Sequence, residues 1–596
     1  TFSELTHTFY DNYDWVSQNG NYFSTTYDPS YDSYFEAVSN TTWPYGQANS
    51  QSLQTRGMVT GSWVKNLNSA NYSYTLNIYN ARGQVIQVKM INSSLGTDIL
   101  TTQYSWSGKP IISINKTQKV GNNAQTSVVV TRLSYDDLGR VVKSEKKLSN
   151  TLVNSGNMSG YKTISEIEYN KLGQVKTKKM GTNPVAVGAL ETQGFEYNIR
   201  GWMLGVNRNY VKTPGSTSNW FGFELGYDKT SIKPDMGSVI GNFSTALYNG
   251  NICGSVWKTN GDDEIRKFDY SYDAVNRLTG AGFSQYTGGS FNVNDGLDFS
   301  VNNLTYDANG NIMTMKQKAW KVTQSSFMDE LVYNYYPNSN RLKNVIDSQN
   351  DPQTKLGDFR TSAAYMTALG GTKTSLAADY TYDNNGNLKK DLNKDIGTAA
   401  AEDIVYNVLN LPQSITFRNA NGTVKGTILY GYDAAGNKQW KQVNETGQPT
   451  KITLYMGGAV YQDDTLQFIG QEEGRIRFVP TDGVNAAKFE YDYFLKDHLG
   501  SVRMVLTEEI QNVQYEALSF EGSSGSQVVT KQDQQWENVN GHTINVMGVR
   551  SGRPGGFGSS GSNGDYVRLI RKSTGSIGAT KFLKVMAGDK IHTSVD

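Results

Sequence analysis

Two stretches of the chain place oxygen-bearing side chains at the alternating spacing of a calcium-binding loop. These side chains belong to Asp307, Asn309 and Asn311 and to Asp383, Asn385 and Asn387. Calcium prefers carboxylate and amide oxygens, but an EF-hand loop also requires a bidentate Glu at its twelfth position. That position holds Lys318 in the first stretch and Lys394 in the second. We therefore expect both stretches to cap turns, and we predict no metal site.

Three pairs of adjacent carboxylates have the residue types that a glycosidase uses as acid and base. The pairs are Asp463/Asp464, Glu472/Glu473 and Glu508/Glu509. Neighbouring residues on a strand point to opposite faces, so the two members of a pair need not face each other. We interpret all three pairs as surface charges.

The four histidines and the single cysteine also form no recognisable catalytic centre. The four histidines, His7, His498, His542 and His592, lack the spacing of metal ligands, and no serine or cysteine nucleophile motif accompanies them. We expect His498 to have a packing role. The single cysteine, Cys253, excludes an intrachain disulfide and a Cys-rich zinc site. We predict no catalytic residue and no cofactor, and hence that the chain is not an enzyme.

The feature that recurs along the chain is a strand followed by a tight turn, as in LTYDANGNI at residues 304–312. Thr305 and Tyr306 favour a strand. The Asp307 side chain can accept hydrogen bonds from backbone amides two residues on, and Gly310 adopts a positive φ at little steric cost. This pattern predicts a hairpin corner.

Most copies have Asp or Asn directly after the tyrosine and Gly or Asn at the fourth position after it. Turn chemistry explains the residues at both positions. Asp and Asn side chains can accept backbone hydrogen bonds within a turn, and Asn is the non-glycine residue that best tolerates the left-handed region. Two copies depart from the pattern: Ser231 stands where Gly is expected, and Pro337 follows Tyr336, whose fourth position is Asn340. The predicted structural turn residues are Asp136, Gly139, Asp273, Asn276, Asp307, Gly310, Asp383, Gly386, Asp433, Gly436, Asp497 and Gly500.

The elements that position these corners are short strands. Tyrosine and glycine are abundant, at 37 and 60 residues, and only 19% of residues are charged, which favours an all-β fold. The corner tyrosines from Tyr79 to Tyr432 are unevenly spaced. This argues against a propeller of equal blades and predicts one long array of hairpins in a curling sheet.

Charge gives little indication of a nucleic-acid partner. The net charge is +1, and no run of about 18 apolar residues is available for a transmembrane segment. One segment, 140–179, is lysine-rich, and a polyanion-binding stripe is the alternative interpretation there. We favour a solvated strand face, because glutamates are interspersed and no aromatic ladder accompanies the cations. The cations are Arg140, Lys143, Lys146, Lys147, Lys176, Lys178 and Lys179.

Composition divides the chain into four parts. Residues 1–55 are predicted to be strands and loops joined to the array, 56–489 the array itself, 490–518 a segment that ends it, and 519–596 a Gly/Ser-rich linker with a partial β module. Because the sequence starts without Met and stops within a strand pattern, we expect it to be part of a longer protein.

Roughly residues 56 to 506 resemble the RHS/YD-repeat proteins, which are named for Tyr-Asp repeats of the form YxYDxxGRL. The tail, 566–591, looks like the region that follows the core in RHS proteins of Bacteroidetes-type bacteria. DHLGSVRMVL (497–506) is similar to the RHS-associated core segment. The closest repeats are LSYDDLGRVV (133–142), YSYDAVNRLTG (270–280), YTYDNNGNLKK (380–390) and YGYDAAGNKQWK (430–441).

The resemblance implies a hollow shell, in which a spiralling β-sheet strip forms a cocoon around a polypeptide, commonly a C-terminal toxin. It also implies a secreted or cell-surface location, with secretion-machinery components as partners; export by the type IX system is a hypothesis. Some members cleave themselves near an Asp-Pro motif after the core, whereas Asp28-Pro29 and Asp351-Pro352 precede it here. We therefore expect no self-cleavage within this chain. A cell-surface adhesin or carbohydrate-binding scaffold is the alternative function.

Overall fold

The computed structural model describes residues 3–321, 324–351, 357–481, 485–510, 543–545 and 566–568. The chain divides into two compact units, Thr1–Glu509 and Ile510–Asp596. In the second unit, β36 (Thr543–Asn545) pairs antiparallel with β37 (Tyr566–Arg568). The rest of the predicted linker and β module, including the Gly/Ser-rich run 550–564 and the strand 581–591, lies outside the described residues.

The first sheet has 21 strands, and almost every strand pairs antiparallel with the next strand along the chain. This confirms the predicted all-β hairpin array. Two detours interrupt the order, because β13 pairs with β16 and β18 pairs with both β19 and β20. The strands are β1 (Thr6–Tyr10), β2 (Val59–Lys65), β3 (Tyr72–Tyr79), β4 (Val85–Ile91), β5 (Thr97–Tyr104), β6 (Pro110–Lys119), β7 (Gln125–Tyr135), β8 (Val141–Asn150), β9 (Lys162–Tyr169), β10 (Val175–Met180), β11 (Glu191–Tyr197), β12 (Met203–Val206), β13 (Phe221–Gly226), β16 (Gly254–Thr259), β17 (Ile265–Tyr272), β18 (Leu278–Thr287), β19 (Ser290–Asn292), β20 (Val301–Tyr306), β21 (Ile312–Lys321), β22 (Gln324–Tyr335) and β23 (Leu342–Asp347).

The second sheet continues the same meander with 10 strands. Its strands are β26 (Ile404–Tyr406), β27 (Pro412–Arg418), β28 (Val424–Tyr432), β29 (Lys438–Glu445), β30 (Lys451–Met456), β31 (Ala459–Gln462), β32 (Thr465–Gln471), β33 (Gly474–Val479), β34 (Lys488–Lys496) and β35 (Val502–Thr507). Two short hairpins lie outside these sheets, formed by β14 (Ser231–Ile232) with β15 (Gly241–Asn242) and by β24 (Tyr380–Tyr382) with β25 (Leu388–Asp391).

Helices are few and short among the described residues. They are α1 (Trp15–Gln18), α2 (Arg208–Lys212) and α3 (Ala363–Ala368), with 3-10 turns at Asp32–Tyr34, Asn154–Gly156 and Leu392–Lys394. No helix in this part of the chain is long and apolar enough to cross a membrane.

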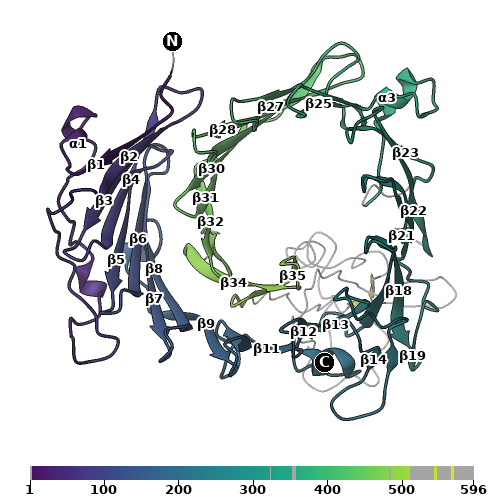
Figure 1. Ribbon diagram of the computed structural model, residues 1–596, viewed down its shortest axis with the longest axis horizontal. Helices are drawn as coiled ribbons and strands as arrows, with labels where there is room; N and C mark the ends of the chain where they lie inside the picture. Colours follow the sequence, from purple (N-terminus) through teal and green to yellow (C-terminus); the bar gives the residue numbers. More distant parts are fainter. Residues whose placement is uncertain are drawn as a thin grey trace. The chain divides into compact units, whose positions relative to one another are not determined.

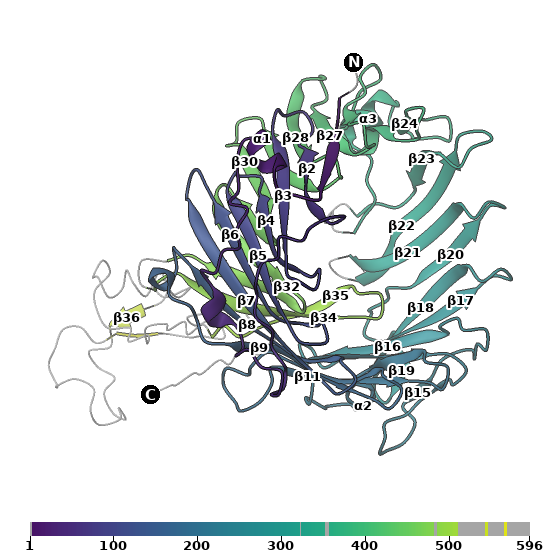
Figure 2. The ribbon, with the colours of Figure 1, turned by 60° about the vertical axis from the view of Figure 1, so that its left-hand side comes forward.

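The strip of strands in the first unit curves, and its corners give a local reason. The register shifts by one residue at the corner tyrosine, as between Thr305 and Tyr306 of β20, where Tyr306 pairs with Ile312 and Thr305 with Thr314. Such a bulge bends the strand and increases its right-handed twist. Because the same shift recurs at most corners, the bends add up along the strip (Figures 1 and 2).

Both faces of the early strands are covered. On one face, Tyr31, Tyr34 and Phe35 of the N-terminal segment pack with Ile112 and Ile114 of β6. The other face meets the second sheet, where the Asn115 amide of β6 donates to the Gly457 carbonyl, and Figure 1 shows β32 and β34 near β8 and β9. The core of the first unit is therefore a layered region in which strands distant in sequence lie face to face.

Candidate functional site

Each corner is held by its aspartate, as Asp307 shows. Its Oδ1 accepts the backbone N–H groups of Asn309 at 2.9 Å and Asn311 at 2.8 Å, while Oδ2 accepts the Asn311 side-chain amide at 2.8 Å. These hydrogen bonds, led by the one from the Asn311 side chain, lower the pKa of Asp307. The carboxylate is thus engaged in the turn, and Lys318 pairs with Asp298 at 2.7 Å on a different part of the strip.

The structure places all twelve predicted turn residues in such corners. The other five aspartates likewise accept the backbone amide four residues ahead through Oδ1. The fourth position has a positive φ at Gly139 (+73°), Asn276 (+68°), Gly310 (+87°), Gly386 (+88°), Gly436 (+88°) and Gly500 (+82°). An L residue with a bulky side chain is strained in this region, so Gly and Asn occupy it.

The two copies that depart from the pattern in sequence also depart from it in structure. No corner forms at Ser231, which lies in β14, because the chain leaves the sheet after Tyr227 and returns at Cys253. At Tyr336, the backbone amide donates to the carbonyl of Arg341, so this turn is one residue longer than the others. The positive φ accordingly falls on Asn338 (+54°) rather than on Asn340.

Successive corners are linked by tyrosine hydroxyls, a contact that no sequence motif predicted. Tyr306 donates to the carbonyl of Leu278 at 2.7 Å, and Leu278 lies two residues beyond the fourth position of the preceding corner. A corner tyrosine therefore both packs beside its strand and satisfies a backbone acceptor of the previous repeat. The same bond joins Tyr79 to Val59, Tyr104 to Val85, Tyr135 to Pro110, Tyr169 to Val141, Tyr227 to Met203, Tyr272 to Ile252, Tyr335 to Ile312, Tyr382 to Leu342 and Tyr406 to Leu388.

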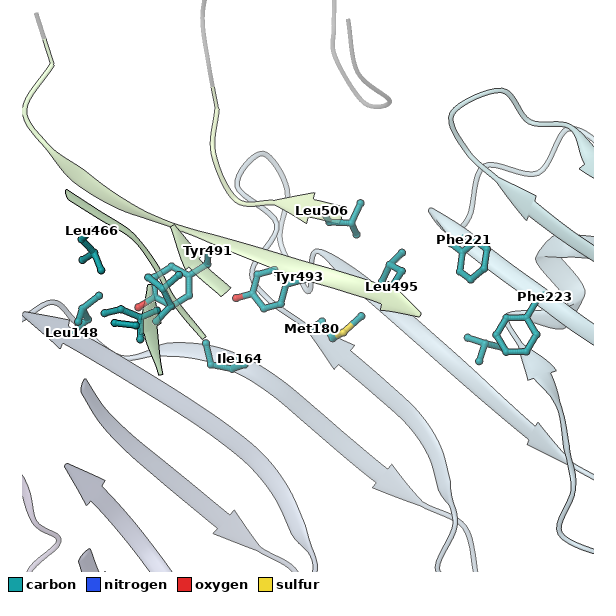
Figure 3. Packing of buried hydrophobic residues seen from close by; sticks show 14 of the residues in the cluster. Leu148, Ile164, Met180, Phe221, Phe223, Leu466, Tyr491, Tyr493, Leu495 and Leu506 are labelled. Atoms are coloured by element: carbon teal, nitrogen blue, oxygen red, sulfur yellow. The ribbon is translucent and has the colours of Figure 1, made fainter. Parts of the chain in front are cut away.

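The contacts between β6–β13 and β30–β35, together called the seam, join strands of the first half of the strip to its last strands. Its apolar part includes Leu148, Ile164 and Met180 from the first sheet and Leu466 and Tyr493 from the second, and Figure 3 shows these side chains pointing toward one another. Fully burying one such large apolar side chain contributes about 1.5–3 kcal/mol. The seam is thus a shared hydrophobic core between the two sheets.

The polar part of the seam consists of ion pairs. Lys146 Nζ lies 3.1 Å from Glu472 Oε2, and Ser144 donates to Oε1 of the same carboxylate. Lys178 pairs with Glu473 at 3.0 Å. Burial alone would raise the pKa of Glu472, but Lys146 and Ser144 together hold it below its usual value.

The last strand of the second sheet is anchored through Glu508. Its Oε1 accepts the Tyr493 hydroxyl and the Thr182 backbone N–H, both at 2.9 Å, and its Oε2 pairs with Lys162. Burial and the nearby Glu508 carboxylate raise the pKa of the Tyr493 phenol. Glu508 therefore connects the end of β35 to β9 and to the turn after β10.

These contacts correct two interpretations made from sequence. The acidic pairs are not simply surface charges, because Glu472, Glu473 and Glu508 pair across the seam and Asp464 pairs with the buried Lys119 at 2.8 Å. Glu509 pairs with Arg477 at 2.7 Å within the second sheet. The two members of each Glu pair have different partners, but not through strand alternation, because Glu472 and Glu473 lie in the turn between β32 and β33 and Glu508 and Glu509 follow β35.

The lysine-rich segment is also not a uniformly solvated face. Lys146 and Lys178 belong to the seam, and Lys147 lies over the rings of Tyr34 and Tyr161 at 4.0 and 4.6 Å. Lys143 pairs with Glu145 at 3.2 Å. Local sequence carries no signal for the seam pairs, because their members are separated by about three hundred residues, as in the 328 between Ser144 and Glu472.

The described histidines and the cysteine have packing environments. The His7 ring lies 4.4 Å from that of Phe9, and the His498 ring lies 5.8 Å from that of Phe223, where burial lowers the pKa of His498. Cys253 is buried, which raises the pKa of its thiol to about 11. His542 and His592 lie outside the described residues.

Comparison with known proteins gives a distant structural likeness. No protein-family model and no curated protein sequence matches the chain. Among solved structures, it is similar to a chain in the crystal structure of TcdB2-TccC3-Cdc42, with a TM-score of 0.41 and 12% sequence identity. The similarity covers 78% of this chain and 22% of that one, so this chain spans less than a quarter of the length of that chain.

Proposed function

We propose that this chain is the shell of an RHS/YD-repeat protein that encloses a C-terminal polypeptide cargo, such as a toxin, and helps to deliver it in interbacterial competition or host interaction. In this proposal the chain is not an enzyme. The observation that carries the proposal is the seam, which packs the last strands of a curving strip of hairpins against strands of its first half. The Tyr-Asp repeats and the core-like segment 497–506 support it by resemblance.

A shell that encloses a polypeptide needs stable contacts where its strip of strands closes, and the seam provides several kinds of contact. A long strip of sheet exposes unpaired edges unless it curls and covers them. Here the corner at Tyr432 also makes backbone hydrogen bonds to the end of β2, from Leu67 to Tyr432 and from Ala434 to Lys65, both at 2.8 Å. Apolar packing, ion pairs and backbone bonds together keep the two ends of the strip in contact.

Protection of the downstream polypeptide from protease tests this function. The complete reading frame, with an epitope tag at its C-terminus, is digested in native buffer and in urea. We expect the tag to survive in native buffer only. Glu472→Lys combined with Glu508→Lys places like charges opposite Lys146 and Lys162, so the tag becomes accessible while far-UV circular dichroism still reports folded strands.

Glu168→Lys is the matched control, because Glu168 is an exposed residue on β9, the strand that carries Lys162. It makes one Glu-to-Lys change, half the charge change of the double variant, outside the ion pairs of the seam and leaves the tag protected. If the double variant fails to fold, Lys162→Met is used instead, because it removes the ion pair with Glu508 without placing like charges together. A tag digested equally fast in native buffer and in urea would exclude encapsulation.

Export and source form a separate part of the proposal. The tail motif at 566–591 resembles proteins of Bacteroidetes-type bacteria, so we propose a secreted or cell-surface protein exported by the type IX system. Fractionation of such a host, with and without a working type IX system, tests this. Retention of the protein inside the cells of the deficient strain supports the route, and unchanged secretion argues against it.

A carbohydrate-binding scaffold is a second candidate, favoured by one cavity. This cavity of about 220 Å³ lies where the β2–β3 turn meets β27 to β29. Its lining is uncharged and combines the amides of Asn68, Gln413 and Gln439 with the rings of Tyr430 and Trp440. Amides and aromatic rings are suited to neutral sugars, because they offer hydrogen bonds beside an apolar face.

Saturation-transfer NMR with neutral oligosaccharides tests this second candidate. Signal from the wild type that is lost in Trp440→Ala supports it, whereas Trp106→Ala, at an exposed tryptophan outside the cavity, retains the signal. Absence of signal from the wild type removes this function without affecting the encapsulation test.

A further inference from the structure

Three carboxylates converge near the end of the first sheet, where no sequence motif predicted a site. Asp329 lies on β22, Asp347 is the last residue of β23, and Asp358 lies in the connection that leads toward β24. One oxygen atom from each residue lies within 4.8 Å of the other two. The cluster therefore brings two neighbouring strands and a later loop to one point.

The carboxylates are buried and incompletely satisfied. The side chain of Asp358 is 0% exposed, yet its Oδ1 has no hydrogen-bond partner among the described residues. Oδ2 of Asp347 is also buried and lacks a partner in that part of the chain, and Asp329 is buried. Burying a carboxylate oxygen without a donor or a cation is costly, so these two oxygens indicate a positive group that the described side chains do not supply.

The remaining oxygens are held in place by the backbone. Asp329 Oδ1 accepts the Phe359 N–H at 2.8 Å, and Asp347 Oδ1 accepts the N–H groups of Glu330 at 2.9 Å and Gln349 at 3.0 Å. These bonds orient the carboxylates before any ligand binds.

Among the described residues, acidic groups outnumber basic ones around the cluster. Arg360 lies 2.8 Å from Oδ2 of Asp358, and Lys321 acts on Asp329 at longer range. Oδ2 of Asp358 also accepts the backbone N–H of Asp351, whose own carboxyl adds a further acid nearby. The ion pair with Arg360 engages the Asp358 oxygen opposite the unpartnered one, so it does not satisfy Oδ1.

We propose that Asp329, Asp347 and Asp358 bind a calcium ion that ties β22, β23 and the following connection together. The ligand atoms are all carboxylate oxygens, which hard cations prefer, and the cluster contains no His or Cys to favour zinc. Oxygens bound to one calcium ion at about 2.3–2.6 Å lie within about 5 Å of one another, a condition that the three carboxylates already meet. Water completes the coordination.

Calcium titration of the purified chain, after dialysis against a chelator, tests the proposal. At pH 7.5 we expect one binding site by calorimetry and a rise in Tm of about 2 °C or more at saturating calcium. Asp347→Asn abolishes both effects. Because the variant removes an unbalanced buried charge while its amide oxygen can still accept from Glu330 and Gln349, its Tm without calcium should be equal to or higher than that of the wild type.

Asp307→Asn is the control, since Asp307 belongs to the calcium-like sequence pattern but is engaged in its turn. It leaves the calcium-induced rise in Tm unchanged. An absence of binding to the wild type, an equal response in Asp347→Asn, or an equal response of the wild type to magnesium would overturn the calcium site at this cluster.

Discussion

The hydroxyl of Tyr493 donates a 2.9 Å hydrogen bond to Oε1 of Glu508, and this bond lies inside the contact between the two sheets. Tyr493 is fully buried, and Glu508 also receives the Thr182 backbone N–H from the first sheet. The bond therefore orients the carboxylate that connects the last strand of the strip to its early strands.

Tyr493→Phe should destabilise the protein by about 1–3 kcal/mol, because the ring still fills its site while a buried carboxylate loses a donor. Urea unfolding followed by tyrosine and tryptophan fluorescence measures this change. Tyr248→Phe is the matched control, since Tyr248 is 74% exposed. Equal stability of the two variants would contradict a structural role for the Tyr493–Glu508 bond.

Gly310→Val should cost about 1–2 kcal/mol through backbone strain alone. Gly310 has a φ of +87° and open space where a Cβ would be, so no steric clash contributes. Gly310→Asn should cost less, because Asn276 and Asn410 occupy the same position in their own corners, with φ values of +68° and +58°. Thermal denaturation of both variants is compared with Gly160→Val, which also has open space but no positive φ. A loss at Gly160 as large as at Gly310 would exclude the conformational explanation.

The ion pair of Glu472 with Lys146 should stabilise the protein in a pH-dependent way. The folded pKa of Glu472 lies below its ordinary value of 4.5, so its contribution is fully present above about pH 4.5 and is lost as the pH falls through the lower, folded value. Chemical denaturation of the wild type and Glu472→Gln from pH 3 to pH 7 measures this. The difference between them should shrink toward acid pH, whereas Glu168→Gln, at an exposed position, shows no such trend.

Cys253 should react very slowly in the native protein. Its thiol is buried, and its pKa of about 11 leaves little thiolate at pH 8. We expect alkylation by iodoacetamide, followed by mass spectrometry, to be about 100-fold slower or more than in denaturant. Native labelling as fast as that of the unfolded chain would mean that the segment around Cys253 opens readily.

The repeated corners were determined by local sequence. An Asx-turn needs an Asp or Asn followed by a residue that tolerates positive φ, and both requirements act within five residues. The twelve predicted turn residues could be found for this reason. The two copies that depart from the pattern show the limit of this reasoning. The chain leaves the sheet before Ser231 and forms no corner there, while the turn that contains Pro337 is one residue longer, so that Asn338 takes the positive φ.

Only the tertiary structure decided which side chains meet across the strip. Alternation along β8 places Ser144, Lys146 and Leu148 on one face, but it does not reveal that Glu472 and Leu466 lie opposite. The same is true of Asp329, Asp347 and Asp358, which come together because β22, β23 and a later loop meet at one point. The physical reason is that the sum of many small bends at the corners sets where the strip returns, and each repeat encodes only its own bend.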